Sequence, residues 1–381
     1  MTLGIMEQNT SLKTARQSNF ELLRIVAMFF VLLLHANWLA FRFPTSSEIG
    51  ISPISSFLRM WMEAITIVAV NTFVLISGYF GIRLRGKSLV SLLFQSGFYI
   101  LGIYLVLVLA LNKPLSPEQL LLNFSPLAPS GGWFIPIYVG LMLVSPALNT
   151  YVEQAPKKSL ARLILLGVAL EAIFGWGVNH LQVQNGYSVL SFVLLYLIGR
   201  YLNRYAEDFK RYQGSFYLKL FLILSFVNAL ALYMLSALHL FMPSIPADLA
   251  NKGMVAGLLL AYSSPINIAG AVCLVLLFSR IRIQSKAINW IASSTLAVYL
   301  IHCNEGLINW YISTVWVLSF YPMILFLIYL LLFLVAVFFG SILVDKLRIA
   351  LWQYIGSPIY DRLSMLVKRS IPSISETESY P

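Results

Sequence analysis

Two side chains of one apolar stretch could do chemistry together. Arg24 and His35 lie eleven residues apart in the run Ser18–Trp38, SNFELLRIVAMFFVLLLHANW. In a helix, eleven residues make about three turns, so both side chains share one face and lie about 16 Å apart along the axis. A histidine can act as a general base on a hydroxyl or as a nucleophile that carries an acyl group, and an arginine suits a phosphate.

A second stretch with reactive groups is NWIASSTLAVYLIHCNEGL, which contains Tyr299, His302 and Glu305. The spacing of His302 and Glu305 places them on one face of a continuous helix, where they could interact. A Glu305 that is simply solvated at the outer end of the helix is an equal alternative. His302 is a second titratable group deep in an apolar run.

Three further candidates have an ordinary structural explanation. Ser77 and Gly78, in NTFVLISGYF, are small residues of the kind that allow close helix packing, and the alternative is that they line a site. Trp133 follows two glycines at an expected outer helix start, where a tryptophan is typically an interfacial anchor.

The elements that position these residues are membrane helices. The chain is 59% hydrophobic and only 11% charged, which predicts an all-α, polytopic integral membrane helix bundle. A titratable side chain inside a bilayer costs at least a few kcal/mol, so His35 should face the protein interior or an aqueous cavity. Arg24 alone could also extend to lipid phosphate at the interface. Ser18 and Glu21 have capping-box spacing, which predicts a helix start near Asn19.

Hydropathy predicts ten membrane spans, of which the eighth is interrupted by AYSSPIN. They cover roughly residues 20–41, 64–82, 88–111, 132–150, 160–178, 186–202, 216–241, 254–279, 288–313 and 321–345.

The distribution of basic residues predicts the topology. With the N-terminus in the cytoplasm, the inside segments hold 21 of the 26 Lys and Arg residues, and the outside segments hold four. Both termini are therefore expected in the cytoplasm. The net charge of +11 thus reflects membrane topology and gives no reason to expect a nucleic-acid partner.

The first span is too long for a cleavable signal and should remain in the protein as part of a multi-pass protein of the cell (plasma or inner) membrane. We expect a cytoplasmic segment 1–18, a membrane domain 19–345 and a partly disordered cytoplasmic tail 346–381. Cys273 and Cys303 have no metal-type spacing, so we interpret them as packing residues and expect no metal site.

Four segments in order resemble acyltransferase family 3, a family of polytopic membrane proteins. Its mark is an arginine, ten intervening residues and a histidine in the first span, which Arg24 and His35 match. NTFVLISGYF resembles its Ser-Gly-aromatic segment, GGWFIPIYVGLMLVSPAL its Trp-led segment, and SSTLAVYLIH its late Tyr-Leu-Ile-His segment. The resemblance covers residues 19–345. Asn71 departs from it, because the family usually has an apolar or aromatic residue there.

The resemblance implies transfer of an acyl group, usually acetyl from acetyl-coenzyme A, to a hydroxyl of a surface polysaccharide or its lipid-linked precursor. It makes His35 the catalytic histidine and Arg24 its required partner. Arg24 is assigned to coenzyme A phosphate from its inner position. No tightly bound cofactor is expected, since acetyl-coenzyme A would be a substrate. The candidates for donor or acceptor binding are Ser77, Gly78, Trp133, Tyr299, His302 and Glu305.

Some members of that family carry a fused extracytoplasmic esterase-like domain, and this chain shows none. The bundle would therefore act alone on its carbohydrate or glycolipid acceptor, or a separate extracytoplasmic transferase would complete the reaction. The alternative from another class is a transporter or flippase of a glycolipid or polysaccharide, which would equally explain many spans with buried polar groups. Use of coenzyme A separates the two.

Overall fold

All regular structure in the described residues is helical. The computed structural model describes residues 16–112, 114–177, 184–249 and 259–370, and those ranges contain no strand. Parts of the predicted fifth and eighth spans, and the tail beyond residue 370, lie outside the described residues.

Six helices of the described ranges are long and apolar enough to cross a membrane. They are α1 (Ser18–Phe41), the continuous pair α3 (Pro53–Thr66) and α4 (Ala69–Phe80), α5 (Gly86–Ala110), α7 (Phe134–Gln154), α11 (Gly214–Phe241) and a long rod that begins with α17 (Met323–Leu351). The predicted all-α membrane helix bundle is confirmed. The number of spans and the side on which the termini lie stay predictions.

The remaining predicted spans correspond to shorter helices. They are α8 (Lys157–Leu170) with its continuation η2 (Glu171–Gly177), α9 (Val189–Arg204), α13 (Pro265–Ser279), α14 (Lys286–Ala292), α15 (Thr295–His302) and α16 (Glu305–Leu318). Short helices lie in the connections: α2 (Ser46–Ile51), α6 (Pro117–Asn123), η1 (Pro129–Gly131), η3 (Gln184–Gly186) and α10 (Ala206–Phe209).

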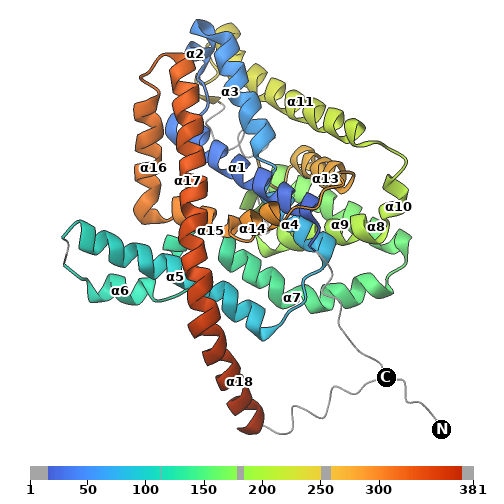
Figure 1. Cartoon of the computed structure of the whole chain (residues 1–381). Helices are drawn as coiled ribbons and strands as arrows, with labels where there is room; N and C mark the ends of the chain where they lie inside the picture. The colour runs from blue at the N-terminus through green and yellow to red at the C-terminus, as the bar shows by residue number, and fades with distance from the viewer. Residues whose placement is uncertain (1–15, 113, 178–183, 250–258, 371–381) are drawn as a thin grey trace.

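The first helix, α1, occupies the middle of the bundle (Figure 1). It packs against α3, α4, and α13 to α17, so elements from both halves of the chain surround it. Its buried apolar side chains belong to two adjoining cores, with Leu23 and Leu34 in one, and Met28 and Leu32 in the other. Polar groups on the remaining face of α1 are therefore held inside the protein.

The start of α1 is not fixed by the predicted capping box. The N-cap is Gln17, which makes no side-chain cap hydrogen bond. Ser18 Oγ instead accepts from the backbone N–H of Ser285, 3.0 Å away, and Glu21 pairs with Arg24. Ser18 is fully buried against the segment before α14, so its hydroxyl bonds to that segment and does not cap its own helix.

The predicted ninth span is not one helix. α15 ends at His302, and α16 begins at Glu305 behind the N-cap Asn304, whose side chain accepts from the backbone N–H of Gly306. Asparagine is a strong N-cap because its oxygen satisfies a free helix-start N–H. His302 and Glu305 thus lie on different helices and Glu305 is exposed, so the structure agrees with the alternative in which Glu305 is solvated and not with a contact between the two.

The interruption predicted in the eighth span is present. Residues 260–264, before α13, are not helical. Irregular backbone at membrane depth needs partners for its carbonyl groups. Buried Asn71 donates from Nδ2 to the Tyr262 carbonyl at 2.9 Å, and buried Asn267 donates to the Ala261 carbonyl at 2.8 Å. Asn71, the residue that departs from the family pattern, therefore stabilises this non-helical segment through its hydrogen bond.

The last helix continues past the predicted end of the tenth span. α17 runs through η5 (Trp352–Gly356) into α18 (Ser357–Ser370), forming the long rod in Figure 1. Asp345, the last residue of the predicted tenth span, and Arg348, in the predicted cytoplasmic tail, are buried and paired with each other. Tyr99 of α5 also donates to Asp345 at 2.8 Å, which ties the rod to the bundle.

α4 and α9 cross at very short range. A Cβ on Gly78 would lie 2.3 Å from the Tyr196 carbonyl oxygen, and a Cβ on Gly199 would lie 2.3 Å from the Leu75 carbonyl oxygen. Neither position can hold a larger residue without separating the helices. Gly78 therefore has the packing function that small residues commonly have in membrane helices.

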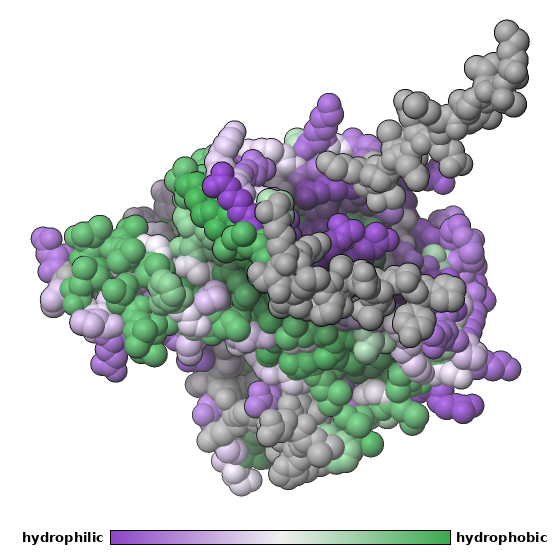
Figure 2. All heavy atoms as spheres, turned by 90° about the horizontal axis from the view of Figure 1, so that it is seen from below, coloured by the Kyte–Doolittle hydropathy of each residue, from purple (hydrophilic) through white to green (hydrophobic). Residues whose placement is uncertain are grey.

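The surface is largely apolar where helices face outward. Exposed large apolar side chains occur along α5, α8, α11 and α17. Figure 2 views the end of the molecule toward which α18 extends, where hydrophilic residues gather over the centre and one edge beside broad apolar surface. Such an apolar exterior is stable in lipid and not in water.

Candidate active site

A cavity of about 340 Å³ lies inside the bundle against one face of α1. Along α1 its lining includes Glu21, Arg24, Met28, Val31 and His35, which are spaced three or four residues apart. That spacing is one helix face, so the predicted shared face of Arg24 and His35 is present, and both side chains reach the same cavity.

The cavity brings together five of the eight candidate residues. They are Arg24, His35, Ser77, Trp133 and Tyr299. Gly78 lies at the α4–α9 crossing, and Glu305 is exposed at the start of α16, so neither lines it. His302 is not in the lining either, but its Nε2 lies within hydrogen-bond distance of His35 Nδ1.

Arg24 is held by a carboxylate of its own helix. Its Nη1 donates to Glu21 Oε1 at 2.8 Å, and Arg16 also lines the cavity. The Arg24 side chain remains 31% exposed, while that of Glu21 is 9% exposed. Arg16, Arg24 and Glu21 together leave a net positive charge in the cavity lining, which suits an anionic group of a ligand.

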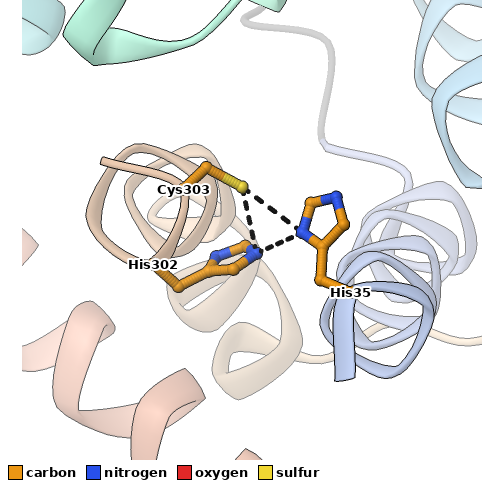
Figure 3. A group of neighbouring side chains, drawn as sticks. All are labelled: His35, His302 and Cys303. Carbon is orange, nitrogen blue, oxygen red and sulfur yellow. Dashed lines mark hydrogen bonds between the residues drawn. The ribbon is translucent and has the colours of Figure 1, made fainter. Parts of the chain in front are cut away.

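His35 is hydrogen-bonded to a second histidine from a distant part of the chain. His35 Nδ1 lies 3.0 Å from His302 Nε2 (Figure 3). His302 Nδ1 in turn lies within hydrogen-bond distance of the Val298 carbonyl oxygen, one turn earlier in α15. A carbonyl only accepts, so His302 carries its proton on Nδ1 and its Nε2 is the acceptor.

This chain of contacts fixes the tautomer of neutral His35. His302 Nε2 accepts the Nδ1 proton of His35, which leaves His35 Nε2 with a free lone pair. Nε2 points away from His302 and Cys303 (Figure 3) and has no hydrogen-bond partner among the described residues. His35 lines the cavity, so a basic nitrogen is available to a bound hydroxyl.

Aromatic side chains from elements other than α1 form an aromatic wall of the cavity. Trp133 and Tyr262 lie with ring centroids 5.7 Å apart, and Tyr138 OH is 3.1 Å from Ser77 Oγ. Tyr299 closes the wall beside Gly132, which has a φ of +83° and whose Cβ would lie 2.5 Å from the Tyr299 hydroxyl. Only glycine fits there, for both its conformation and its size.

Sequence reasoning missed five residues at or beside the site, of which Arg16 is one. The Glu21–Arg24 pair had a detectable signal, because residues spaced i, i+3 are helix neighbours. Tyr138 and Tyr262 had none beyond their aromatic type. Cys303 was interpreted as packing, but its Sγ lies 3.4 Å from His35 Nδ1 and 3.2 Å from His302 Nε2.

Comparisons with known proteins identify the family. The family model described as "Acyltransferase domain", acyltransferase family 3, matches residues 17–346. No curated protein and no solved structure matches the chain. The match spans nearly the whole sequence and agrees with the apolar helices and with the first-helix arginine and histidine. The chain therefore belongs to acyltransferase family 3 and is a multi-pass membrane acyltransferase.

Proposed function

We propose that this acyltransferase moves an acetyl group from acetyl-coenzyme A to a hydroxyl of a surface polysaccharide or its lipid-linked precursor, with His35 as general base. The observation that carries the proposal is the hydrogen-bond chain from the Val298 carbonyl through His302 to His35. It leaves one basic nitrogen, His35 Nε2, on the side chain that lines the cavity. Family membership supports acyl transfer in general.

In this reaction His35 Nε2 takes the proton of the acceptor hydroxyl as its oxygen attacks the thioester carbonyl. The tetrahedral intermediate then collapses, the carbon–sulfur bond breaks, and the coenzyme A sulfur takes the proton back from Nε2. The imidazolium formed in between shares its Nδ1 proton with His302 Nε2, which stabilises the charge.

The other lining groups suit the two substrates. Arg24 and Arg16 supply positive charge for the phosphates of coenzyme A. The aromatic wall with Trp133, Tyr262 and Tyr299 offers flat apolar faces and hydroxyls, a combination that fits a sugar ring. A flippase without acyl transfer would leave the tautomer-fixing contact at His35 without a role.

The test is transfer of radiolabelled acetyl from acetyl-coenzyme A in membranes that express the wild type, His35→Ala and Arg24→Ala at equal folded levels. We expect label in membrane glycolipid or polysaccharide with the wild type, and a loss of about 100-fold or more with His35→Ala. The matched control is His239→Ala, since His239 lies at the end of α11 and contacts the Ile245 carbonyl.

Equal labelling by the His35 variant would overturn the role of this residue as base. Recovery of acetyl on the His35 imidazole under neutral denaturing conditions would instead make His35 the nucleophile. No use of acetyl-coenzyme A with any acceptor would overturn the choice of donor.

A further inference from the structure

The Cys303 thiol has no part in the proposed acyl transfer, yet it touches both histidines. Figure 3 shows Cys303, His302 and His35 with their side-chain ligand atoms facing one another. His35 comes from α1, His302 ends α15, and Cys303 follows it directly. The three ligand atoms lie within 4.8 Å of one another. Two imidazoles and one thiol are a ligand set that zinc uses.

We propose that His35, His302 and Cys303 form a Zn²⁺ site, and that zinc bound there switches off His35 as a base. The proposal that zinc binds is supported by the positions of the three ligand atoms alone. The switching rests on the proposed function, because it needs His35 Nε2 to accept a proton during the reaction.

The spacing of the three atoms matches a tetrahedral zinc site closely. Zn–N bonds of about 2.0–2.1 Å and Zn–S bonds of about 2.3 Å place two nitrogens about 3.3 Å apart, and nitrogen and sulfur about 3.6 Å apart. Here the nitrogens are 3.0 Å apart, and the sulfur lies 3.4 and 3.2 Å from them. Each pair needs to separate by only a few tenths of an ångström to admit the ion.

His302 is already oriented as a metal ligand. A ligating histidine typically donates its other ring N–H to a carbonyl or carboxylate, which fixes both ring orientation and tautomer. The Val298 carbonyl has this position relative to His302 Nδ1. The Nε2 lone pair therefore points toward His35 and Cys303 independently of any ion. The fourth coordination position is left for water or a ligand in the cavity.

Zinc binding moves two protons, one on Cys303 and one on His35. The Cys303 thiol loses its proton to solvent as the Zn–S bond forms. The His35 proton moves from Nδ1 to Nε2, because Nδ1 now binds the ion through its lone pair. His35 then presents an N–H to the cavity in place of a lone pair, so it can no longer take the proton of an acceptor hydroxyl.

The site can be tested on the purified full chain with Co²⁺ as a spectroscopic substitute for Zn²⁺. A tetrahedral site with one thiolate gives intense visible d–d bands and a near-ultraviolet thiolate-to-cobalt charge-transfer band. We expect both bands at one Co²⁺ per chain in the wild type, and their displacement by Zn²⁺. Cys303→Ser should lose the charge-transfer band, while Cys273→Ser, a change of the buried cysteine in α13, should keep it.

Acetyl transfer measured on the same variants tests the switch. Zinc should inhibit the wild type and Cys273→Ser, and chelation should restore both. Cys303→Ser should retain transfer without zinc and need at least tenfold more zinc for half inhibition. Absence of the charge-transfer band from folded wild type overturns the site, and bands without inhibition overturn the switch. Bands together with a complete lack of acetyl transfer uphold the site while refuting the proposed function and the switch.

Discussion

At the scale of single residues, the reactivity of His35 depends on which of its two nitrogens holds the proton. A free imidazole exchanges tautomers readily, and one of its two tautomers would present an Nε2–H to the substrate. The contact with His302 selects one tautomer by a hydrogen bond 3.0 Å long. In the proposed mechanism His302 is therefore a positioning residue, in the way that a buried carboxylate orients the histidine of a catalytic triad.

Replacing His302 with alanine should lower kcat for acetyl transfer by about 100-fold, because His35 loses the acceptor that selects its tautomer. The KM for acetyl-coenzyme A should change little, since His302 does not line the cavity. Steady-state kinetics on the folded variant measure both quantities. A rise in KM with unchanged kcat would assign His302 to substrate binding instead.

Replacing Glu21 with glutamine should lower the KM for acetyl-coenzyme A by about three- to tenfold. Glu21 now accepts from Arg24 at 2.8 Å and would repel a phosphate at the same place. A nearby like charge removed from a ligand site changes affinity by roughly 1 kcal/mol. Donor titrations provide the measurement, with Arg24→Lys as a comparison that keeps the charge. A higher KM in Glu21→Gln would mean that Glu21 orients Arg24 productively.

At the scale of helices, two glycines and one asparagine decide how elements meet. Gly78 and Gly199 let α4 and α9 approach to backbone contact, and Asn71 satisfies the carbonyl of a break before α13. None of these three residues touches a substrate in the proposed reaction. They determine where the cavity wall stands, because Ser77 precedes Gly78 and Tyr262 belongs to the break.

Replacing Gly78 with alanine should lower the stability of the protein in detergent by about 1–3 kcal/mol, the range for overpacked cores. The added methyl would meet the Tyr196 backbone at 2.3 Å, which cannot move without shifting α9. Thermal unfolding in detergent measures the effect. The matched control is Gly340→Ala in α17, where a Cβ would have no neighbour within 4 Å. Equal unfolding temperatures for the two variants would contradict the close crossing.

The sequence predicted the fold class and the shared face of Arg24 and His35, because both follow from composition and from the period of a helix. It could not predict the break between α15 and α16, which depends on Asn304 capping a new helix inside an apolar run. It also missed Cys303, since its partners lie across the bundle as well as beside it. Contacts between residues 267 positions apart, such as His35 with His302, leave no local pattern.

At the scale of the whole molecule, the rod of α17 and α18 is attached to the bundle through a buried charge. Asp345 accepts from Arg348 of the same helix and from Tyr99 of α5. Asp345 is fully buried, and Arg348 is 5% exposed. The cost of burying each charge is offset only while its partner is present, because a single buried charge has no opposite charge to compensate it.

Replacing Asp345 with leucine should destabilise the protein by about 3–5 kcal/mol and reduce the folded yield, since Arg348 then keeps an uncompensated buried charge. The double variant with Arg348→Met should recover a large part of this loss. Size-exclusion chromatography and thermal unfolding in detergent measure both variants. A double variant no better than the single one would show that the Tyr99 contact, and not the ion pair, holds the rod.

The central place of α1 has a consequence for biogenesis. α1 is translated before the other described helices, but its packing partners extend to α17, and His302, which contacts His35, is translated 267 residues later. A nascent chain that has inserted only its first half carries His35 without the hydrogen bond that directs its lone pair. In the proposed reaction, a chain that stops before α15 therefore contains His35 but lacks the contact that selects its tautomer, so such a truncated chain should be inert toward the acyl donor.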